Sequence, residues 1–374
     1  MNTTTESNPA VPVLAARRIS MQDRYSTERL RDLSLEIYKG DVVALIGSSE
    51  EAKRLLLRCL DLQERPEGGN VELNGKPVQW RRGGADRARR SIGMAFSRES
   101  LFRNLTVFGN MMIAPTDASR ADEGQSQERV KNLLKFAGLS GVAESMPANL
   151  TTGQRRRLAI VRALALKPEI LLIEDPGANL LPEERNEVYT LIHAVIKTGM
   201  TILFSSRDLD FVRDTATRVA FMADGMIREI GTTKEVLDHP QFDRTKAFIR
   251  KNTGFYRELN SHAFDIYEFD GVLEAFSARK LLPPEKRREL RKALQILLLE
   301  MLFPRISRIV LSIDVGRKTG DVNVLVQYPG AGFDPLTQMS GADAEKVQAE
   351  LVGLVKSVKY SSSVTGKNEL SLLL

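Results

Sequence analysis

A buried strand that runs directly into a helix sets the fold class of this chain. Residues 42–46 are all apolar, Gly47 ends the run, and a helical pattern follows at 52–61. An apolar run of this length predicts a strand that is buried on both faces. Strands that alternate with helices predict an α/β domain with a largely parallel sheet. Further strand patterns lie at 92–96, 170–173, 201–205 and 219–222, with helical patterns at 126–137, 153–166 and 183–197 between them.

The last third of the chain has a different pattern. A charged helical pattern at 284–302 precedes strand patterns at 308–315, 321–328 and 369–374, which predicts an α+β unit. A unit of this length can fold as a domain of its own. We therefore expect a flexible tail at 1–12, a first domain at 13–250, a linker at 251–270 and a smaller C-terminal α+β accessory or regulatory domain at 271–374.

The composition narrows the classes of function. The formal net charge is +6, but 54 basic residues are mixed with 48 acidic ones. Nucleic-acid binding is not expected, because few aromatic side chains stand beside basic clusters as stacking platforms would require. The single cysteine, Cys59, excludes an intramolecular disulfide and fits a reducing compartment. The apolar stretch at 293–303 is too short and too charged to span a bilayer, so membrane attachment is expected only through partners.

The segment after the first strand has the position of a phosphate-binding loop. Gly47, Ser48 and Ser49 follow the strand directly, and Lys53 and Arg54 lie at the start of the helix. In such a loop the backbone amides and the helix N-terminus face a phosphate group. Gly47 and Lys53 have the spacing of such a loop, although this pair also occurs often by chance.

Two later motifs add to this loop. Residues 150–157 precede a helix, and the strand pattern at 170–173 ends in Glu174 and Asp175. Two carboxylates at the end of a strand are what Mg²⁺ and an attacking water need. With these motifs in this order, residues 13–250 resemble the ATP-binding-cassette (ABC) ATPases, especially those that energise the uptake of polar amino acids. That subfamily is also similar in the stretches at 92–96, 101–107, 224–227 and 239–242.

The resemblance implies a P-loop NTPase-like cassette with a mixed, largely parallel sheet, which binds ATP and Mg²⁺. It also implies a cytoplasmic protein that forms a homo- or heterodimer with a second cassette subunit. Such a dimer docks on membrane permease subunits at the inner face of the cell membrane. Carried over by motif, the cofactor-binding positions are Tyr25, Gly47, Ser48, Ser49, Lys53, Arg54, Ser97, Thr151, Thr152, Gly153 and Gln154, the metal position is Glu174, and the general-base and switch positions are Asp175 and Arg207.

The phosphate loop departs from the family pattern. Glu50, Glu51 and Ala52 stand where the family has glycines and small residues. Glycine permits a positive φ and lets backbone amides approach the phosphates. Two like charges ~4 Å apart cost about 4 kcal/mol near a protein surface, so either carboxylate is expected to lower nucleotide affinity more than tenfold. Arg54 replaces the Mg²⁺-binding Ser or Thr, and a guanidinium has no acceptor that coordinates a cation.

The catalytic positions are altered as well. Glu174 and Asp175 reverse the family's Asp-Glu order, and Asp175 is one methylene shorter than the usual general base. A displacement on the ångström scale can cost ~100-fold in rate. By resemblance, Ser97 replaces the glutamine that senses Mg²⁺ and the permease, Arg207 replaces the switch histidine, and Leu181 replaces the aspartate that communicates across the dimer.

Several positions allow two interpretations. Lys53 either binds phosphate or forms an internal salt bridge with Glu50 or Glu51, and the nearness of these carboxylates favours the salt bridge. Tyr25 either stacks on adenine or is a core or edge-strand aromatic residue. Thr152 puts a β-branched side chain where the family's glycine allows close approach, which weakens the signature element without abolishing it.

The C-terminal unit has a weaker resemblance of its own. Residues 326–335, with the helix at 297–303 and the last strand, are similar to part of the histidine-kinase-type ATP-binding domains. Tyr328 stands where that family has the aspartate that reads adenine, and the helix lacks the Mg²⁺-binding asparagine. A glycine-rich loop of this length is usually only a turn, so a regulatory or dimerisation module is the alternative.

Three functions are compatible with these patterns. The first is a cassette subunit of an amino-acid importer that is a pseudo-ATPase and lends residues 151–154 to a partner's site. The second is a non-catalytic regulatory or scaffold protein that uses the cassette fold and the C-terminal domain for protein interaction. The third is an active enzyme with unusual motifs, in which Glu174, Asp175, Lys53 and Tyr25 do the work.

Overall fold

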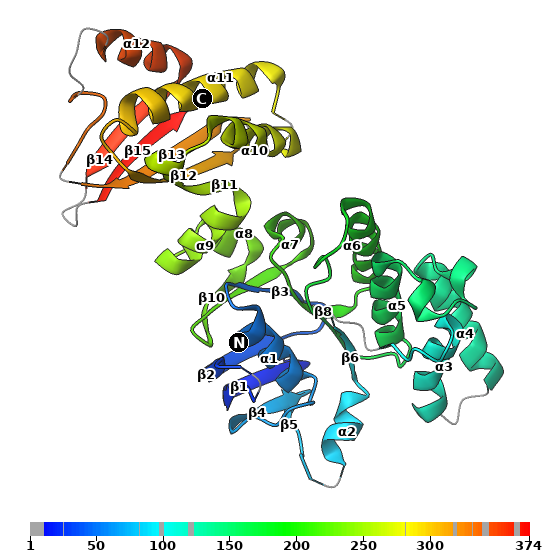
Figure 1. Ribbon diagram of the computed structural model, residues 1–374. Helices are drawn as coiled ribbons and strands as arrows, with labels where there is room; N and C mark the ends of the chain where they lie inside the picture. The colour runs from blue at the N-terminus through cyan, green and yellow to red at the C-terminus, as the bar shows by residue number, and fades with distance from the viewer. Residues whose placement is uncertain are drawn as a thin grey trace, which may run out of the picture. The chain divides into compact units, whose positions relative to one another are not determined.

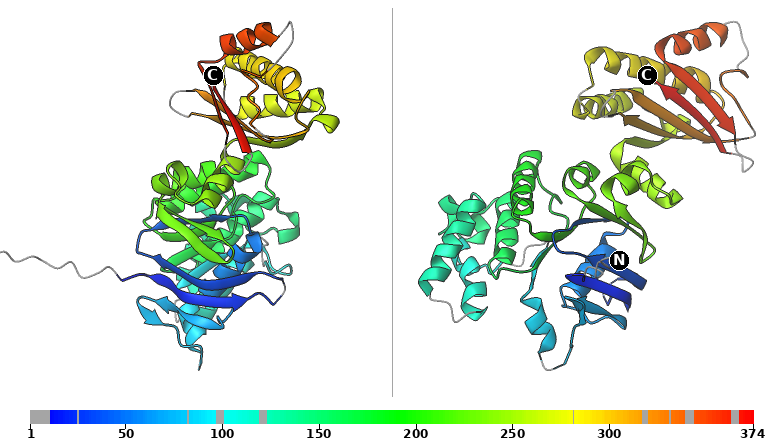
Figure 2. Two further views of the ribbon diagram at one scale, coloured as in Figure 1. Left: turned by 90° about the vertical axis from the view of Figure 1, so that its left-hand side faces the viewer. Right: turned by 180° about the vertical axis from the view of Figure 1, so that it is seen from behind.

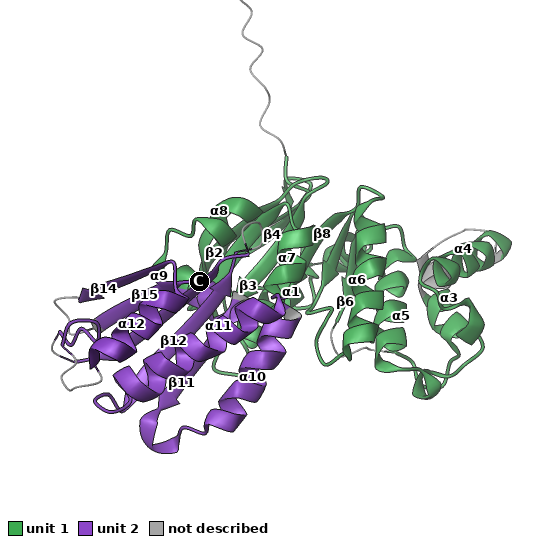
Figure 3. Cartoon of the chain, turned by 90° about the horizontal axis from the view of Figure 1, so that it is seen from above, with its two compact units in different colours: residues 1–246 green, residues 247–374 purple. Residues whose placement is uncertain are grey.

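The computed structural model divides the chain into two compact units, residues 1–246 and 247–374 (Figure 3). The predicted boundary at 250 and the predicted linker at 251–270 differ from this division. Strand β11 (Phe255–Asn260) pairs with β12 (Arg308–Val315), so the predicted linker contributes a strand to the second unit. The structure describes residues 11–374 except 25, 82, 97–100, 119–122, 281, 317–319, 331, 339–343 and 363–366.

The first unit contains two sheets (Figure 1). The four-stranded sheet is antiparallel, with the order β2-β1-β4-β5, and consists of β1 (Leu14–Gln22), β2 (Arg29–Ile37), β4 (Gly68–Leu73) and β5 (Lys76–Pro77). The six-stranded sheet has the order β10-β9-β3-β8-β7-β6 and is parallel apart from β10. The predicted mixed, largely parallel sheet is therefore confirmed. Its strands are β3 (Val42–Gly47), β6 (Ile92–Ala95), β7 (Ile170–Ile173), β8 (Thr201–Ser205), β9 (Arg218–Ala223) and β10 (Met226–Thr232).

Helix α1 anchors the first unit by burying apolar side chains against these sheets. Helix α1 begins after Ser49 and buries Leu55, Leu56 and Cys59 in the core that both sheets share. Figure 1 shows α3 to α6 grouped at one side of the larger sheet. The helices are α1 (Glu50–Leu60), α2 (Gly84–Arg89), α3 (Val107–Ala118), α4 (Glu123–Phe136), α5 (Thr152–Leu164), α6 (Pro182–Ile196), α7 (Leu209–Thr215) and α8 (Thr233–Asp238), with α9 (Asp243–Thr253) across the boundary and 3-10 turns at Ser140–Val142 and Pro147–Asn149.

The second unit has an α+β fold, as predicted. Its sheet is antiparallel throughout, with the order β11-β12-β13-β15-β14. Figures 1 and 2 show the helices on one face of this sheet, where Phe276, Leu297 and Leu311 contribute to a separate core. The remaining elements are a 3-10 turn (Ser261–Ala263), α10 (Ile266–Arg279), α11 (Pro284–Gln295) with its π-helical continuation (Ile296–Leu302), β13 (Val322–Pro329), α12 (Ala344–Leu354), β14 (Ser357–Ser362) and β15 (Lys367–Leu373).

Within the described ranges, the helices are all too short or too polar to cross a membrane.

Candidate nucleotide-binding site

Three neighbouring strands of the larger sheet bring the predicted site residues together. Lys53 is on the helix after β3, Glu174 and Asp175 follow β7, and Arg207 follows β8. Strand β8 lies between β3 and β7 and is parallel to both. The carboxyl ends of parallel strands meet at one edge of a sheet. In α/β proteins, ligands bind at this edge.

The loop between β3 and α1 has a backbone that requires its first glycine. Gly47 has φ of 150°, and a Cβ at this position would lie 2.2 Å from the carbonyl oxygen of Met222. Ser48 is exposed, while the hydroxyl of Ser49 caps α1 by accepting a hydrogen bond from the Ala52 N–H at 3.1 Å. The loop therefore has the close strand contact of a phosphate loop, but the hydroxyl of Ser49 already occupies one of the amides that would face a phosphate.

Lys53 is satisfied within the chain. Its side chain is fully buried, and Nζ donates to the carbonyl oxygen of Gly47 at 3.0 Å and to Oε1 of Glu50 at 2.8 Å. The internal salt bridge, which was one of the two interpretations of Lys53, is therefore present in the structure. Its partner is Glu50, the first residue of α1.

Arg54 pairs with the carboxylate at the metal position. Its Nε donates to Oε1 of Glu174, and Glu174 is only 4% exposed. No sequence pattern predicts this pair, because the two residues lie on different elements far apart along the chain. The guanidinium of Arg54 thus contacts the carboxylate at the position where the family has its Mg²⁺ ligand.

Arg207 lies between the two carboxylates of Glu50 and Asp175. Its Nε lies 3.5 Å from Oε1 of Glu50 and 3.4 Å from Oδ2 of Asp175. Burial and then the negative charge of Glu50 raise the pKa of Asp175, and the positive charges of Arg207 and Lys53 oppose this rise. Lys53, Glu50, Arg207 and Asp175 therefore form one continuous chain of ion pairs.

The backbone of Asp175 is held in an unusual conformation. Its φ of 32° lies in a region that residues other than glycine rarely adopt. Its N–H donates to Oγ of Ser205 at 3.1 Å, and its carbonyl oxygen accepts from Nη1 of the buried Arg156 at 2.8 Å. Arg156 belongs to the basic run at the start of α5, and its positioning role was not foreseen.

The signature element begins α5 with a reciprocal capping box. The N–H of Gln154 donates to Oγ1 of Thr151 at 3.2 Å, and the N–H of Thr151 donates to Oε1 of Gln154 at 2.9 Å. Between them, Thr152 is the first residue of the helix, and the N–H of Gly153 donates to Oε1 of Glu184 at 3.0 Å. This last bond lowers the pKa of Glu184, because it stabilises the ionised carboxylate.

Glu184 was not singled out from the sequence. Two of the predicted site residues cannot be placed in the structure. Glu184 lies three residues after Leu181, the N-cap of α6, and a carboxylate at that spacing is a capping signal. Leu181 itself is exposed. Tyr25 and Ser97 lie outside the described residues.

In the second unit, Tyr328 closes its own loop. The side chain is 2% exposed, and its hydroxyl donates to the carbonyl oxygen of Phe333 at 2.9 Å. Burial raises its pKa. The resemblance of this unit to histidine-kinase-type domains stays a prediction.

Comparisons with known proteins agree with this geometry. Residues 30–178 match the family model of ABC transporters. Over 224 residues the chain is 36% identical to the arginine transport ATP-binding protein ArtM of Bacillus subtilis, with 60% of this chain and 93% of ArtM covered. It is also 36% identical over 222 residues to the glutamate transport ATP-binding protein GluA of Corynebacterium glutamicum, with 59% and 92% covered.

A solved structure gives the same result for the fold. CbiO1 from Clostridium perfringens, part of the ABC transporter complex cbiONQ, matches with a TM-score of 0.55 at 26% identity, over 61% of this chain and 92% of CbiO1. The fold and the site at the strand ends define a P-loop-type cassette. The chain belongs to the ATP-binding subunits of ABC transporters, and it resembles those that serve amino-acid uptake. This family implies ATP and Mg²⁺ as ligands.

Proposed function

We propose that this chain is a cassette subunit associated with an amino-acid import permease, and that its own nucleotide site is a pseudo-ATPase site. The observation that carries the proposal is the state of Lys53. This lysine resembles the family's phosphate-binding lysine, but Gly47 and Glu50 already satisfy its buried ammonium group. A phosphate would have to displace Glu50 while Lys53 stayed buried.

The residues present do not fit Mg-ATP. Mg²⁺ requires oxygen ligands, and Arg54 offers only N–H donors and a positive charge where the family has a hydroxyl. Its guanidinium also bonds to Glu174, the carboxylate that would bind the metal. Side chains thus supply the charges that the ligand would supply: Glu50 is the anion beside Lys53 and Arg207, and Arg54 is the cation beside Glu174.

The signature element supports a role beside a second, intact cassette. Residues 151–154 keep a capped helix start, which is the element that would contact a nucleotide held by a partner. In the single chain, the Gly153 amide is bonded to Glu184. The amide has to leave Glu184 before it can donate to a phosphate from the partner. By family resemblance, such a dimer would work in the cytoplasm on permease subunits.

ATP hydrolysis by the purified full-length chain tests this proposal. We expect no hydrolysis above background from the chain alone, and hydrolysis when an intact cassette subunit of the same transporter is added. A variant of that subunit without its general base is the control, because it should abolish the activity of the mixture. Magnesium-dependent hydrolysis by the chain alone at ordinary transporter rates would contradict the proposal.

A regulatory scaffold is the second candidate, and the second unit favours it. This unit folds around its own apolar core with its own sheet, and so can act as an interaction module. Affinity capture with the full-length chain separates the two candidates. Recovery of a permease supports the transporter subunit, whereas recovery of signalling proteins without a permease supports the scaffold.

A further inference from the structure

A second group of arginines lies where the edges of the two sheets of the first unit meet. Strand β2 is the edge of the smaller sheet, and β10 is the edge of the larger one. The N–H of Arg31 on β2 donates to the carbonyl oxygen of Gly225, in the turn before β10, at 2.9 Å. A Cβ on Gly225 would lie 1.9 Å from the carbonyl oxygen of Arg29, so glycine is required for this close approach.

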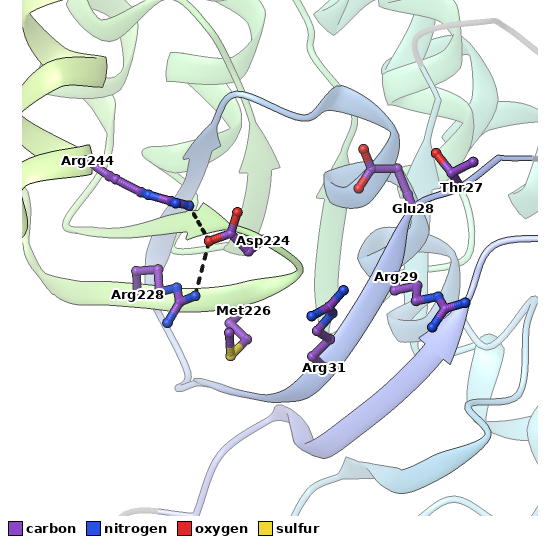
Figure 4. A pocket seen from close by; sticks show the side chains of 8 residues that line it. All are labelled: Thr27, Glu28, Arg29, Arg31, Asp224, Met226, Arg228 and Arg244. Carbon is purple, nitrogen blue, oxygen red and sulfur yellow. Dashed lines mark hydrogen bonds and ion pairs between the residues drawn. The ribbon is translucent and has the colours of Figure 1, made fainter.

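A cavity of about 580 Å³ opens beside this contact (Figure 4). Its volume is within the range of small-molecule sites. Arg29 and Arg31 of β2, Arg228 of β10 and Arg244 of α9 line it. We call this cavity the arginine pocket. Two carboxylates, Glu28 and Asp224, also line it, so its net charge is positive.

One anion of the chain already binds two of the arginines. Oδ2 of Asp224 accepts from Nη2 of Arg228 at 3.1 Å and also from Nη1 of Arg244 (Figure 4). These two bonds hold the pKa of Asp224 below its ordinary value. The contact with Asp224 therefore shows that guanidinium groups of the pocket can bind an anion.

The other two arginines have no such partner. Neither guanidinium, of Arg29 or of Arg31, makes a hydrogen bond or an ion pair with another described residue, although both line the pocket. Two residues apart on one strand, they point to the same face. Each guanidinium carries five N–H donors in a planar fork, which matches the oxygens of a phosphate group.

We propose that the arginine pocket binds a small molecule through a phosphate or diphosphate group, with Arg29 and Arg31 as the main contacts. Charge-assisted, forked hydrogen bonds to phosphate are the strongest that these side chains make. The pocket shares no residue with the loop at 47–54 or with the carboxylates after β7. The proposal therefore does not depend on whether the phosphate loop binds a nucleotide.

Calorimetric titration of the full-length chain with inorganic pyrophosphate, without Mg²⁺, tests the pocket. We expect saturable binding that weakens as salt rises, because exposed charges are screened. The double variant Arg29→Ser, Arg31→Ser should lose at least tenfold in affinity. The double variant Arg65→Ser, Arg90→Ser removes the same charge from exposed positions outside the pocket and should bind like the wild type.

Vesicles distinguish a free phosphate compound from a lipid headgroup as the source. The probes are phosphatidylcholine vesicles with and without phosphatidic acid. If pyrophosphate binds and the Arg29→Ser, Arg31→Ser variant weakens this binding, the ligand is a free phosphate compound. If the chain binds only vesicles with phosphatidic acid, and the same variant weakens that binding, the ligand is a lipid headgroup. Absence of binding to both probes overturns the proposal. So does equal binding by the two double variants, whose folding is checked by thermal unfolding.

Discussion

Arginines occupy two contrasting settings in the first unit. At the phosphate loop, Arg54 pairs with Glu174, and Arg207 lies between Glu50 and Asp175. In the arginine pocket, Arg228 and Arg244 share one carboxylate, and the guanidinium groups of Arg29 and Arg31 pair with no described residue. The same chemical group is thus neutralised internally in one place and available in the other. We infer that the loop has become part of the protein's structure, while the pocket keeps the means to bind an anion.

The ion pairs at the loop and in the pocket also differ in energy, because they differ in burial. Glu174 is almost fully buried and its partner Arg54 is 35% exposed, so removal of Arg54 takes a close cation from a buried carboxylate, at a cost of a few kcal/mol. The side chains of Asp224 and Arg244 are 45% and 67% exposed, and pairs as exposed as this contribute about 1 kcal/mol or less. Substitutions at the loop should therefore have larger effects than substitutions at the pocket.

The largest effect is expected from restoring the phosphate loop. The combined variant Glu50→Gly, Glu51→Gly, Ala52→Gly, Arg54→Ser removes two carboxylates and a guanidinium from the cradle. We expect its affinity for Mg-ATP to rise at least ~100-fold, because each carboxylate alone is expected to lower affinity more than tenfold. Calorimetry measures the change. Addition of Lys53→Ala should remove the gain, and a combined variant with no gain would mean that the loop was never the obstacle.

Breaking the buried pair should destabilise the first unit. We expect Arg54→Met to lower the free energy of unfolding by about 2–4 kcal/mol, because it leaves Glu174 buried without its cation. Addition of Glu174→Gln should recover most of this loss. Urea unfolding measures both, with the exposed Arg90→Met as the control. A loss no larger than that of the control would show that the pair is not a structural element.

At the pocket, removing the internal anion should improve ligand binding. Asp224→Asn removes the negative charge that competes for Arg228 and Arg244, so we expect pyrophosphate affinity to rise about fivefold. The nearby Asp243→Asn, which removes a fully exposed acidic charge outside the pocket lining, should change it little. Unchanged or weaker binding by Asp224→Asn would show that Asp224 does not compete with the ligand for these arginines.

The smallest effect concerns pH at the loop. The pKa of Asp175 is raised in the folded chain, so the folded state holds this proton more tightly than the unfolded state. The wild type should therefore lose stability relative to Asp175→Asn as pH rises from about 4 towards 7. Urea unfolding at several pH values measures the difference. Parallel curves for both proteins would contradict the raised pKa, and Asp243→Asn should show no such trend.

The elements that could be predicted are those whose residues carry their own signal. Strands β3, β7 and β8 are buried on both faces and so appear as short apolar runs. Strand β11 was missed, because the adjacent residues Arg257 and Glu258 are both charged and exposed, which interrupts the alternation of a half-buried strand. Only pairing with β12 makes it a strand.

The salt bridge between Lys53 and Glu50 was among the interpretations of the sequence, because the two residues are three apart. The contacts that join distant segments could not be predicted. Arg54 and Glu174 meet only after β3, β8 and β7 have assembled in one sheet. The bond between Gly153 and Glu184 likewise depends on the packing of α5 against α6. The arginine pocket combines β2, β10 and α9, so its residues form no motif in a chain with many basic residues. Motifs indicated where the loop lies, and only packing revealed the ion pairs that Arg54 and Arg207 form there.

Calorimetric titration of the wild-type full-length chain with Mg-ATP tests the state of the phosphate loop most directly. Glu50 and Arg54 should leave no saturable binding at the loop at ATP concentrations up to about 1 mM, and the Arg29→Ser, Arg31→Ser background removes any contribution from the pocket. Binding in the micromolar range that requires Mg²⁺ and is lost in Lys53→Ala would contradict an internally neutralised site.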